Sequence, residues 1–395
     1  MSTFLFYFSL ALLVYTYAGY PLCIALWARL FPRPVLRAAS FEPEVTLIVV
    51  VHNEEKRIRD KIETCLAQDY PAAKLRILIA SDGSIDGTHA LVQSYAARHN
   101  VRLLPFPTRR GKAACLNDAV AESRGEVLVM TDARQKLSSG AVRCLVENLA
   151  DPAVGAVSGE LMLVNDDMTS FGEGVDAYWK YEKFIRQREA LVHSAPGVTG
   201  ALYAIRRECF QPIPGNTILD DVAIPMQAVR AGRRVVFDGR AHAYDQVSKS
   251  PEQERVRKVR TLAGNYQLIA MMPWLLSPRA NPIFVQFLSH KVLRLVAPFA
   301  MALLLLTNSV LSWDSWGYAL LLLLQIAGYA LPLVAREVPA VAAWRVTKLA
   351  TAFLMLNACA VLGLLQFLSK REGHLWQTQP APAGGETDRR DPGQP

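Results

Sequence analysis

Several patterns that would assign this 395-residue chain to a common class of protein are missing from its sequence. The six cysteines form no CxxC pair, which argues against a disulfide framework and indicates scattered buried thiols in a reducing compartment. The seven histidines lack metal-ligand spacing, so we interpret them as structural or surface residues. Gly111-Lys112 lacks the GxxxxGK(S/T) spacing of a P-loop, although it follows Arg109-Arg110 and is a candidate phosphate contact.

Cations are also missing ahead of the first long apolar run, which covers residues 3–30. A cleaved signal peptide starts with basic residues and has a short apolar core, so this run is predicted to be a retained membrane anchor. It is long enough to cross a bilayer core about 30 Å thick. Three more runs of similar length lie near the C-terminus, and together they predict four membrane spans, at 3–30, 292–311, 316–334 and 348–368.

The distribution of Lys and Arg around these runs predicts the orientation of the chain, because cytoplasmic loops carry an excess of cations. Cations follow the first run, precede the second and separate the third from the fourth, whereas the link 312–315 has none. These cations are Arg29, Arg33, Arg37, Arg279, Lys291, Arg294, Arg336, Arg345 and Lys348. We therefore expect the central region on the cytoplasmic side and the tail after Lys370 on the outside. Arg371, Arg389 and Arg390 in the tail argue against its outside location.

The net charge of +8 indicates an anionic partner. Because the cations gather near the apolar runs and in one late segment, attraction to anionic lipid and to a phosphorylated substrate explains this charge better than nucleic-acid binding does. The last segment, 370–395, is rich in Pro, Gly and charged residues, and it is predicted to be disordered.

Between the first and second apolar runs, short apolar stretches alternate with amphipathic ones. The apolar stretches predict strands at 45–51, 75–80, 101–106 and 126–131, and the amphipathic ones predict helices at 54–67, 87–99 and 113–123. This alternation is typical of an α/β fold with a parallel sheet covered on both faces. Ligands bind such sheets beyond the carboxyl ends of the strands, so the polar residues that follow each strand are the candidates for a site.

Two acidic turns lie at such strand ends. The run SDGSIDGT at 81–88 follows the second strand, and its Asp82 is suited to bind a base or a ribose, although Asp-Gly pairs often make only turns. The run TDAR at 131–134 follows the fourth strand. Its Asp132 either meets a ribose hydroxyl or a divalent ion between two phosphates, or simply caps the next turn.

Two further clusters of charge lie later in the chain. Asp220 and Asp221 open an amphipathic segment, where they either cap a helix or supply a general base, since a partly desolvated carboxylate beside another has a raised proton affinity. In the basic segment 255–260, Arg257 and Arg260 would share one face of a helix. There they would either clamp a diphosphate or form a solvated basic face near the lipid.

Together and in this order, these motifs resemble the membrane-bound branch of the family 2 glycosyltransferases, which includes cellulose, hyaluronan and poly-N-acetylglucosamine synthases. The resemblance covers about 41–267 and also rests on the runs HNEE at 52–55, RGKAACLN at 110–117 and GALYAIRR at 200–207. It implies a GT-A type, Rossmann-like nucleotide-sugar domain and inversion by direct displacement.

The resemblance also implies a role for each matching residue. Asp82 would contact the nucleoside, Asp132 would be the first carboxylate of the Asp-x-Asp motif, and Asp221 would deprotonate the acceptor hydroxyl. The implied set comprises Asp220, Asp221, Arg257 and Arg260 for catalysis, Asn53, Glu54, Asp82, Lys112, Asp132 and Arg134 for the donor, and Gly200 and Ala201 for the acceptor.

Two positions depart from the family pattern. Arg134 stands where the second Asp of Asp-x-Asp normally binds the metal. Either Mg²⁺ or Mn²⁺ is held by Asp132 with other ligands, or Arg134 partly replaces the charge of the ion. Thr261 stands where the Gln-x-x-Arg-Trp motif has its Trp, which removes an aromatic platform for a sugar ring.

The expected organisation has five parts. An N-terminal anchor at 1–40 precedes a cytoplasmic glycosyltransferase domain at 41–250, followed by a basic interfacial segment at 251–291, three spans in 292–369 and the tail 370–395. Within the interfacial segment, 265–276 suits either a helix in the plane of the membrane interface or a lead-in to the next span.

The expected protein is a multi-pass inner-membrane enzyme that transfers a sugar from a nucleotide-sugar, with UDP favoured, in cell-envelope or exopolysaccharide synthesis. Its acceptor is a polysaccharide or a polyprenyl-linked glycan, and its other partners are membrane lipid and other glycan-assembly proteins, without nucleic acid. The alternative is an inactive relative that serves as a scaffold or binding subunit.

Overall fold

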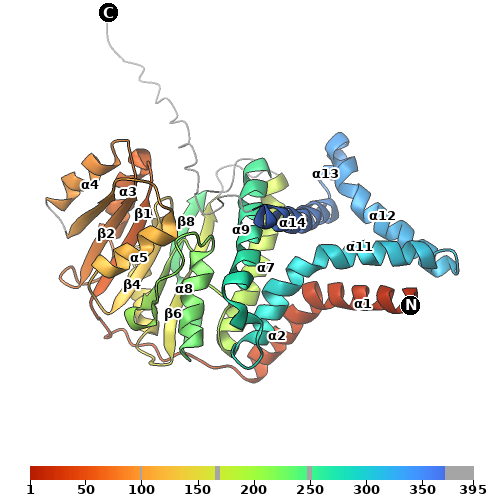
Figure 1. Cartoon of the computed structure of the whole chain (residues 1–395), viewed down its shortest axis with the longest axis horizontal. Coiled ribbons are helices and arrows are strands. Elements are labelled where there is room, and N and C mark those ends of the chain that lie inside the picture. The colour runs from red at the N-terminus through yellow and green to blue at the C-terminus, as the bar shows by residue number, and fades with distance from the viewer. Residues whose placement is uncertain (98–99, 165–169, 247–250, 370–395) are drawn as a thin grey trace, which may run out of the picture.

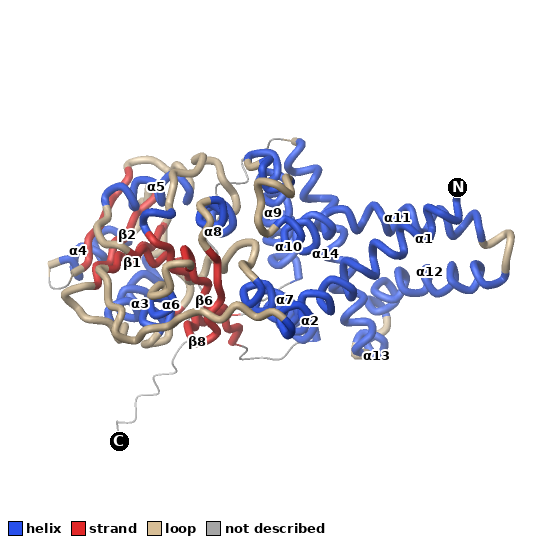
Figure 2. Tube along the Cα trace, turned by 90° about the horizontal axis from the view of Figure 1, so that it is seen from below, coloured by secondary structure: helices blue, strands red, loops and turns tan. Residues whose placement is uncertain are grey.

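The computed structural model describes residues 1–97, 100–164, 170–246 and 251–369. An α/β domain lies at one end of an elongated molecule and a bundle of long helices at the other, with α7, α9 and α14 between them (Figures 1 and 2). The predicted disordered tail, 370–395, lies outside the described residues.

An eight-stranded sheet in the order β3-β2-β1-β4-β7-β6-β8-β5 forms the centre of the α/β domain. Its strands are β1 (Val45–Val51), β2 (Leu75–Asp82), β3 (Val101–Phe106), β4 (Val127–Asp132), β5 (Lys136–Leu137), β6 (Val154–Val164), β7 (Tyr203–Arg206) and β8 (Arg234–Gln246). All seven residues of β1 are buried, which fits a central strand with helices on both faces.

Helices cover both faces of this sheet and form two separate cores. The covering helices are α3 (Glu55–Leu66), α4 (Thr88–Ala96), α5 (Lys112–Glu122), α6 (Ala141–Asn148) and α8 (Asp220–Arg230), and the 3-10 turn η2 (Arg207–Cys209) follows β7. Leu47 and Val49 of β1 pack in one core with α3, α4 and α6, whereas Ile48 and Val50 pack in the other with α5 and α8. This alternation is the period of two of a strand.

The four predicted strands form a parallel sheet, and the second half of the sheet adds strands that the sequence did not predict. β1 to β4 pair in parallel, but β7 is antiparallel to both β4 and β6. The loop 193–202 explains the reversal, because it starts beside β8, where Ala195 N–H donates to Val235 O, and returns to the carboxyl end of β4. There the Thr131 hydroxyl donates to Ala201 O at 2.6 Å. The strand that follows must therefore run in the opposite direction.

In the part of the chain that the structure describes, four helical segments are long and apolar enough to cross a membrane, as predicted. They are Ser2–Leu30 (α1 Ser2–Val14, η1 Tyr15–Gly19, α2 Tyr20–Leu30), Phe284–Leu311 (α10 Phe284–Phe287, η4 Leu288–Val292, α11 Leu293–Leu311), Trp316–Glu337 (α12) and Arg345–Leu368 (α14). The short α13 (Pro339–Ala342) joins the last two. Both views show α1 and α11 side by side (Figures 1 and 2).

The second of these segments begins at Phe284, eight residues before the predicted start at 292. Gln286, Ser289 and His290 lower the hydropathy of its first turns, but their side chains are buried in protein rather than turned to lipid. Lys291 and Arg294 therefore lie in the N-terminal part of this helical segment, and their role as cations that flank the membrane stays a prediction.

The segment before this span is helical. It consists of α9 (Pro251–Met271), which packs along α14, and the 3-10 turn η3 (Pro273–Leu276). Leu268 and Leu275 are buried in the core that α5 and α8 share. One face of 265–276 therefore packs against the protein while Leu276 is exposed, and the choice between an interfacial helix and a lead-in to the second span stays a prediction.

Candidate active site

A cavity of about 450 Å³ opens at the carboxyl end of β4, between the α/β domain and the helical region. The 23-residue helix α7 (Ser170–Val192), α9, α14 and the second span contribute to its wall. Most of the predicted site residues line this cavity, namely Glu54, Lys112, Asp132, Arg134, Gly200, Ala201, Asp220, Asp221, Arg257 and Arg260. Asn53 and Asp82 do not line it.

Lys112, the first residue of α5, connects the two acidic motifs. Its Nζ lies 2.8 Å from Asp132 Oδ1 and 3.0 Å from Asp220 Oδ2. Burial disfavours its charged form, but the carboxylates of Asp132 and Asp220 more than offset this and raise the pKa of Lys112 above its usual value. The ammonium group therefore stays charged between the Asp-x-Asp position and the start of α8.

Asp221 has the properties of a general base. Burial and the neighbouring Asp220 raise its pKa to about 6, while Lys112, Lys291 and Arg186 act in the opposite direction. A carboxylate with this pKa is ionised at neutral pH and still has a higher proton affinity than an ordinary Asp.

The predicted acceptor loop lies directly against this carboxylate. A Cβ atom added at Gly200 would lie 3.4 Å from Asp221 Oδ2, so a side chain there would fill the space beside the base. Lys61, which belongs to no motif, supports the loop indirectly. Its Nζ donates to the Thr131 hydroxyl at 2.7 Å and to Gln135 O at 2.8 Å, and the Thr131 hydroxyl in turn donates to Ala201 O. Its position on the buried face of α3, beside Ile58 and Ile62, gave no sign of this role.

Asp82 is fully buried, and its carboxylate holds the loop before α5. Its two oxygens accept the backbone N–H groups of Arg110 at 2.6 Å and Gly111 at 2.9 Å. Gly83 has a φ of 63°, and a Cβ there would lie 2.6 Å from the Arg109 nitrogen, so the turn requires glycine. The predicted nucleoside contact of Asp82 stays a prediction, and its observed bonds position the donor-side loop.

Asn53 has a similar positioning role, whereas Glu54 reaches the cavity. Asn53 adopts a φ of 52°, and its Oδ1 accepts the Ile85 N–H at 2.9 Å. Glu54 forms an ion pair with Arg57 at 3.0 Å, and burial raises its pKa above the usual value. The HNEE run therefore ties the end of β1 to the 81–88 turn.

Arg134, which replaces the second Asp of Asp-x-Asp, forms an ion pair with Asp245 of β8. Gln135 Nε2 donates to the same Asp245 oxygen at 2.9 Å, and Asp245 is 5% exposed. Asp245 could not be predicted from the sequence, because it lies 111 residues from Arg134 and belongs to no motif. The guanidinium group is thus fixed by a carboxylate on the neighbouring part of the sheet.

Among the acidic residues that line the cavity, Asp132 fits the role of a metal ligand best. No group of three or more His, Cys, Asp or Glu side chains within the described residues has the arrangement of a metal site. The Asp132 side chain is 39% exposed and lines the cavity. Mg²⁺ is commonly held by one or two carboxylates together with substrate phosphates, so a single Asp fits an ion of this kind.

Arg257 and Arg260 both face the cavity from α9, as their spacing predicts. Arg257 forms an ion pair with Glu254. Burial lowers the pKa of Arg260, against the opposing effect of Asp220, Asp221 and Asp132, so its guanidinium group lies within electrostatic reach of all three carboxylates. These positions suit contacts to an anionic leaving group, and that role stays a prediction.

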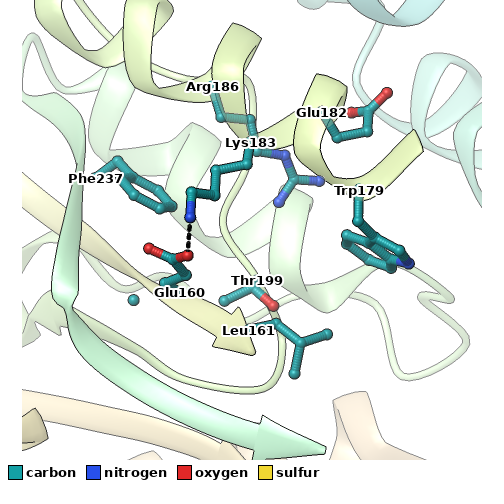
Figure 3. A pocket seen from close by; sticks show the side chains of 9 residues that line it. Glu160, Leu161, Trp179, Glu182, Lys183, Arg186, Thr199 and Phe237 are labelled. Atoms are coloured by element: carbon teal, nitrogen blue, oxygen red, sulfur yellow. Dashed lines mark hydrogen bonds and ion pairs between the residues drawn. The ribbon is translucent and has the colours of Figure 1, made fainter. Parts of the chain in front are cut away.

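Trp179 of α7 adds an aromatic surface that the sequence analysis missed. It lines the cavity, and Lys258 Nζ lies 5.0 Å from the centroid of its ring. A smaller recess on the same side is lined by Glu160, Leu161, Trp179, Glu182, Lys183, Arg186, Thr199 and Phe237 (Figure 3). Trp179 thus places an aromatic ring in the cavity that Thr261 does not supply.

Comparison with known proteins agrees with this geometry. Residues 46–213 match the sequence model of the family Glycosyl transferase family 2. The probable glycosyltransferase YdaM of Bacillus subtilis is 25% identical over 250 residues, which cover 58% of this chain and 56% of that protein. The poly-beta-1,6-N-acetyl-D-glucosamine synthase of Staphylococcus epidermidis is 19% identical over 234 residues, with the same two shares. The match thus spans little more than half the length of these relatives.

A glycolipid enzyme and a solved structure complete the comparison. The beta-monoglucosyldiacylglycerol synthase of Synechocystis is 24% identical over 192 residues, which cover 47% of this chain and 40% of that protein. The mannosyltransferase PcManGT from Pyrobaculum calidifontis, solved in complex with GDP-Man and Mn²⁺, superposes with a TM-score of 0.71 at 24% identity. It covers 93% of this chain and 100% of its own, which establishes the shared fold. The chain therefore carries a family 2 glycosyltransferase domain with the GT-A fold.

Proposed function

We propose that this protein is an inverting glycosyltransferase that moves a sugar from a nucleotide-diphosphate sugar to a glycan or lipid-linked acceptor at the inner membrane. The observation that carries the proposal is the bridge made by Lys112. Its ammonium group contacts Asp132 on the donor side and Asp220, the neighbour of the candidate base, on the acceptor side. Groups for both halves of a displacement therefore meet in one cavity.

The chemistry assigns one task to each group. Asp221 accepts the proton of an acceptor hydroxyl, whose oxygen forms a bond to C1 of the donor sugar as the bond from C1 to the diphosphate oxygen breaks. The attack on the opposite side of C1 inverts its configuration. Lys112 and Arg260 stabilise the negative charge of the departing nucleoside diphosphate.

A divalent ion is part of this proposal. Asp132 would hold Mg²⁺ or Mn²⁺ together with the diphosphate oxygens, and the ion would neutralise part of the leaving-group charge. The solved relative binds GDP-Man with Mn²⁺, which supports testing GDP-sugars beside the UDP-sugars that the sequence favours.

The four apolar helical segments support a location in the membrane. The distribution of cations around them supports a catalytic domain on the cytoplasmic side. The relatives named as poly-beta-1,6-N-acetyl-D-glucosamine and beta-monoglucosyldiacylglycerol synthases support two kinds of product, a polysaccharide and a glycolipid. A role in cell-envelope or exopolysaccharide synthesis, together with other glycan-assembly proteins, is consistent with both.

The test is release of nucleoside diphosphate by the full-length protein in native membranes and in detergent. A panel of UDP- and GDP-sugars is supplied with acceptor lipids and with Mg²⁺, Mn²⁺ or EDTA. The proposal predicts release from one donor, loss of release in Asp221→Asn, and no change in Asp314→Asn, which makes the same chemical change at an exposed link. The absence of release from every donor would favour the scaffold alternative.

A further inference from the structure

Two basic side chains lie at the membrane side of the cavity. Lys291 lies on the second candidate span, two turns from its start at Phe284, and Arg186 lies on α7. Both line the cavity, and neither forms an ion pair within the described residues. Figure 3 shows the Arg186 guanidinium group reaching into the space bounded by Trp179 and Thr199. A cation in a membrane span is costly, and it commonly marks a substrate pathway.

Glu182, which acts electrostatically on both cations, is already engaged by other partners. Glu182 forms an ion pair with Arg294, and its Oε2 lies 3.0 Å from His290 Nε2. Over the whole cavity, nine Lys and Arg side chains face six Asp and Glu side chains. The donor diphosphate would neutralise the cations near Asp132, so positive charge would remain in the cavity for a second anion.

The location of the two cations relative to the base identifies which substrate would bring that anion. Lys291 and Arg186 both act electrostatically on Asp221, which receives the proton of the acceptor. Lys112, tied to Asp132, acts on the same carboxylate from the donor side. Leu356, in the middle of the fourth candidate span, also lines the cavity, so one part of the wall is apolar and belongs to the membrane region.

We propose that Arg186 and Lys291 bind a phosphate group of the acceptor, and that the acceptor is therefore a sugar linked to a lipid through phosphate or diphosphate. This inference rests on the proposed function and selects between its two kinds of acceptor. A guanidinium group binds phosphate oxygens in pairs, and an ammonium group adds a point charge. A neutral glycan in the same place would leave both cations desolvated without a partner, which is unfavourable.

The test compares two acceptors that differ only in the phosphate. One is a polyprenyl diphosphate monosaccharide, and the other is the same monosaccharide joined to the same polyprenol by a neutral glycosidic bond. The kcat/KM for each is measured with full-length protein in nanodiscs of zwitterionic lipid, using the donor identified above. We expect wild type to prefer the phosphorylated acceptor by about tenfold or more, because hydrogen bonds to charged groups contribute at this level.

The variants Arg186→Gln and Lys291→Gln should lose most of this preference through a higher KM for the phosphorylated acceptor, with the KM of the donor unchanged. Lys291→Arg keeps the charge and should retain it within about threefold, whereas Arg186→Lys keeps the charge but not the paired hydrogen bonds and should retain only part of it. Arg336→Gln, at an exposed position outside the cavity, is the matched control and should behave as wild type. Thermal unfolding in the same nanodiscs checks that each variant is folded.

Three results would overturn the inference. One is equal use of both acceptors by wild type, and another is an undiminished preference in the folded Gln variants. The third is a rate with the neutral acceptor that rises when anionic phospholipid is added to wild type but not to the Gln variants. This result would assign the two cations to a membrane headgroup. In all three cases nucleoside diphosphate is still released, so the proposed function stands. The absence of release from every donor of the panel, with acceptor lipids present, is the separate result that would contradict the proposed function itself.

Discussion

Lys112 Nζ lies 3.0 Å from Asp220 Oδ2, at the junction between the donor-side strand ends and the helix that begins with the candidate catalytic acids. In the sequence only a weak pattern points to Lys112, namely a Gly-Lys pair that lacks the spacing of a P-loop. In the fold it becomes the link between the Asp-x-Asp position and the Asp-Asp pair.

Replacing Lys112 by Met should lower kcat by about 10²–10³, the cost of removing one preorganised donor from a developing negative charge. The loss should fall on kcat more than on the KM of the acceptor. Steady-state release of nucleoside diphosphate measures it, and Lys56→Met on the exposed face of α3 is the matched control. A decrease of less than about threefold in folded Lys112→Met would show that this cation does not act in the transition state.

The pH dependence of the reaction follows from Asp221. Burial and Asp220 raise its pKa to about 6, and the base must be ionised to accept a proton. Activity should therefore be full above this value, half at about pH 6 and lost as the pH falls further. Asp220→Asn removes a neighbouring negative charge, so the acidic limb of kcat/KM should move to lower pH. An acidic limb near pH 4 in wild type would contradict the assignment of Asp221 as the base.

The fold itself explains why some site residues were predictable. The strands at 45–51 and 101–106 have the predicted bounds, because continuous apolar runs between polar turns define buried strands well. The motif residues at the carboxyl ends of these strands then converge, as the geometry of α/β sheets requires. Asp132 was found in this way, whereas Asp220 and Asp221 were found as a pair that opens an amphipathic segment.

Other features depend on contacts that no local pattern contains. Asp245 matters only because Arg134 lies beside it in the sheet, and Arg186 only because α7 packs next to the second span. The antiparallel β7 and the early start of the second span were missed for related reasons. The direction of β7 depends on the loop that returns to the end of β4. The start of the second span was predicted too late because buried polar side chains such as His290 lower the local hydropathy.

The ion pair of Arg134 with Asp245 should contribute to stability. Asp245 is buried, and Asp245→Asn removes the charge that balances a partly buried guanidinium group, so the loss should be about 1.5–3 kcal/mol. This should lower the Tm of the purified protein by several degrees. Glu208→Gln, which removes the exposed partner of Arg233, should leave the Tm unchanged. An equal effect of the two substitutions would contradict the structural importance assigned to the Arg134 pair.

Trp179 should contribute to the binding of a sugar ring. Aromatic contacts of this kind contribute about 0.5–1.5 kcal/mol, so Trp179→Ala should raise the KM of the substrate that stacks on it by about two- to tenfold. Separate titrations of donor and acceptor identify which substrate this is, and Trp179→Phe should retain most of the affinity. Trp313, which is 90% exposed, gives the matched control Trp313→Ala. Unchanged KM values for both substrates in Trp179→Ala would exclude the ring from either site.

The central claim is that Asp221 is the base of an inverting sugar transfer. The most direct test uses a donor labelled with ¹³C at C1 and follows this carbon by NMR with full-length wild type and Asp221→Asn. We predict that wild type gives a product with inverted configuration at C1, and that folded Asp221→Asn forms it at least about 10²-fold more slowly. A product with retained configuration, or an equal rate in the variant, would contradict the claim.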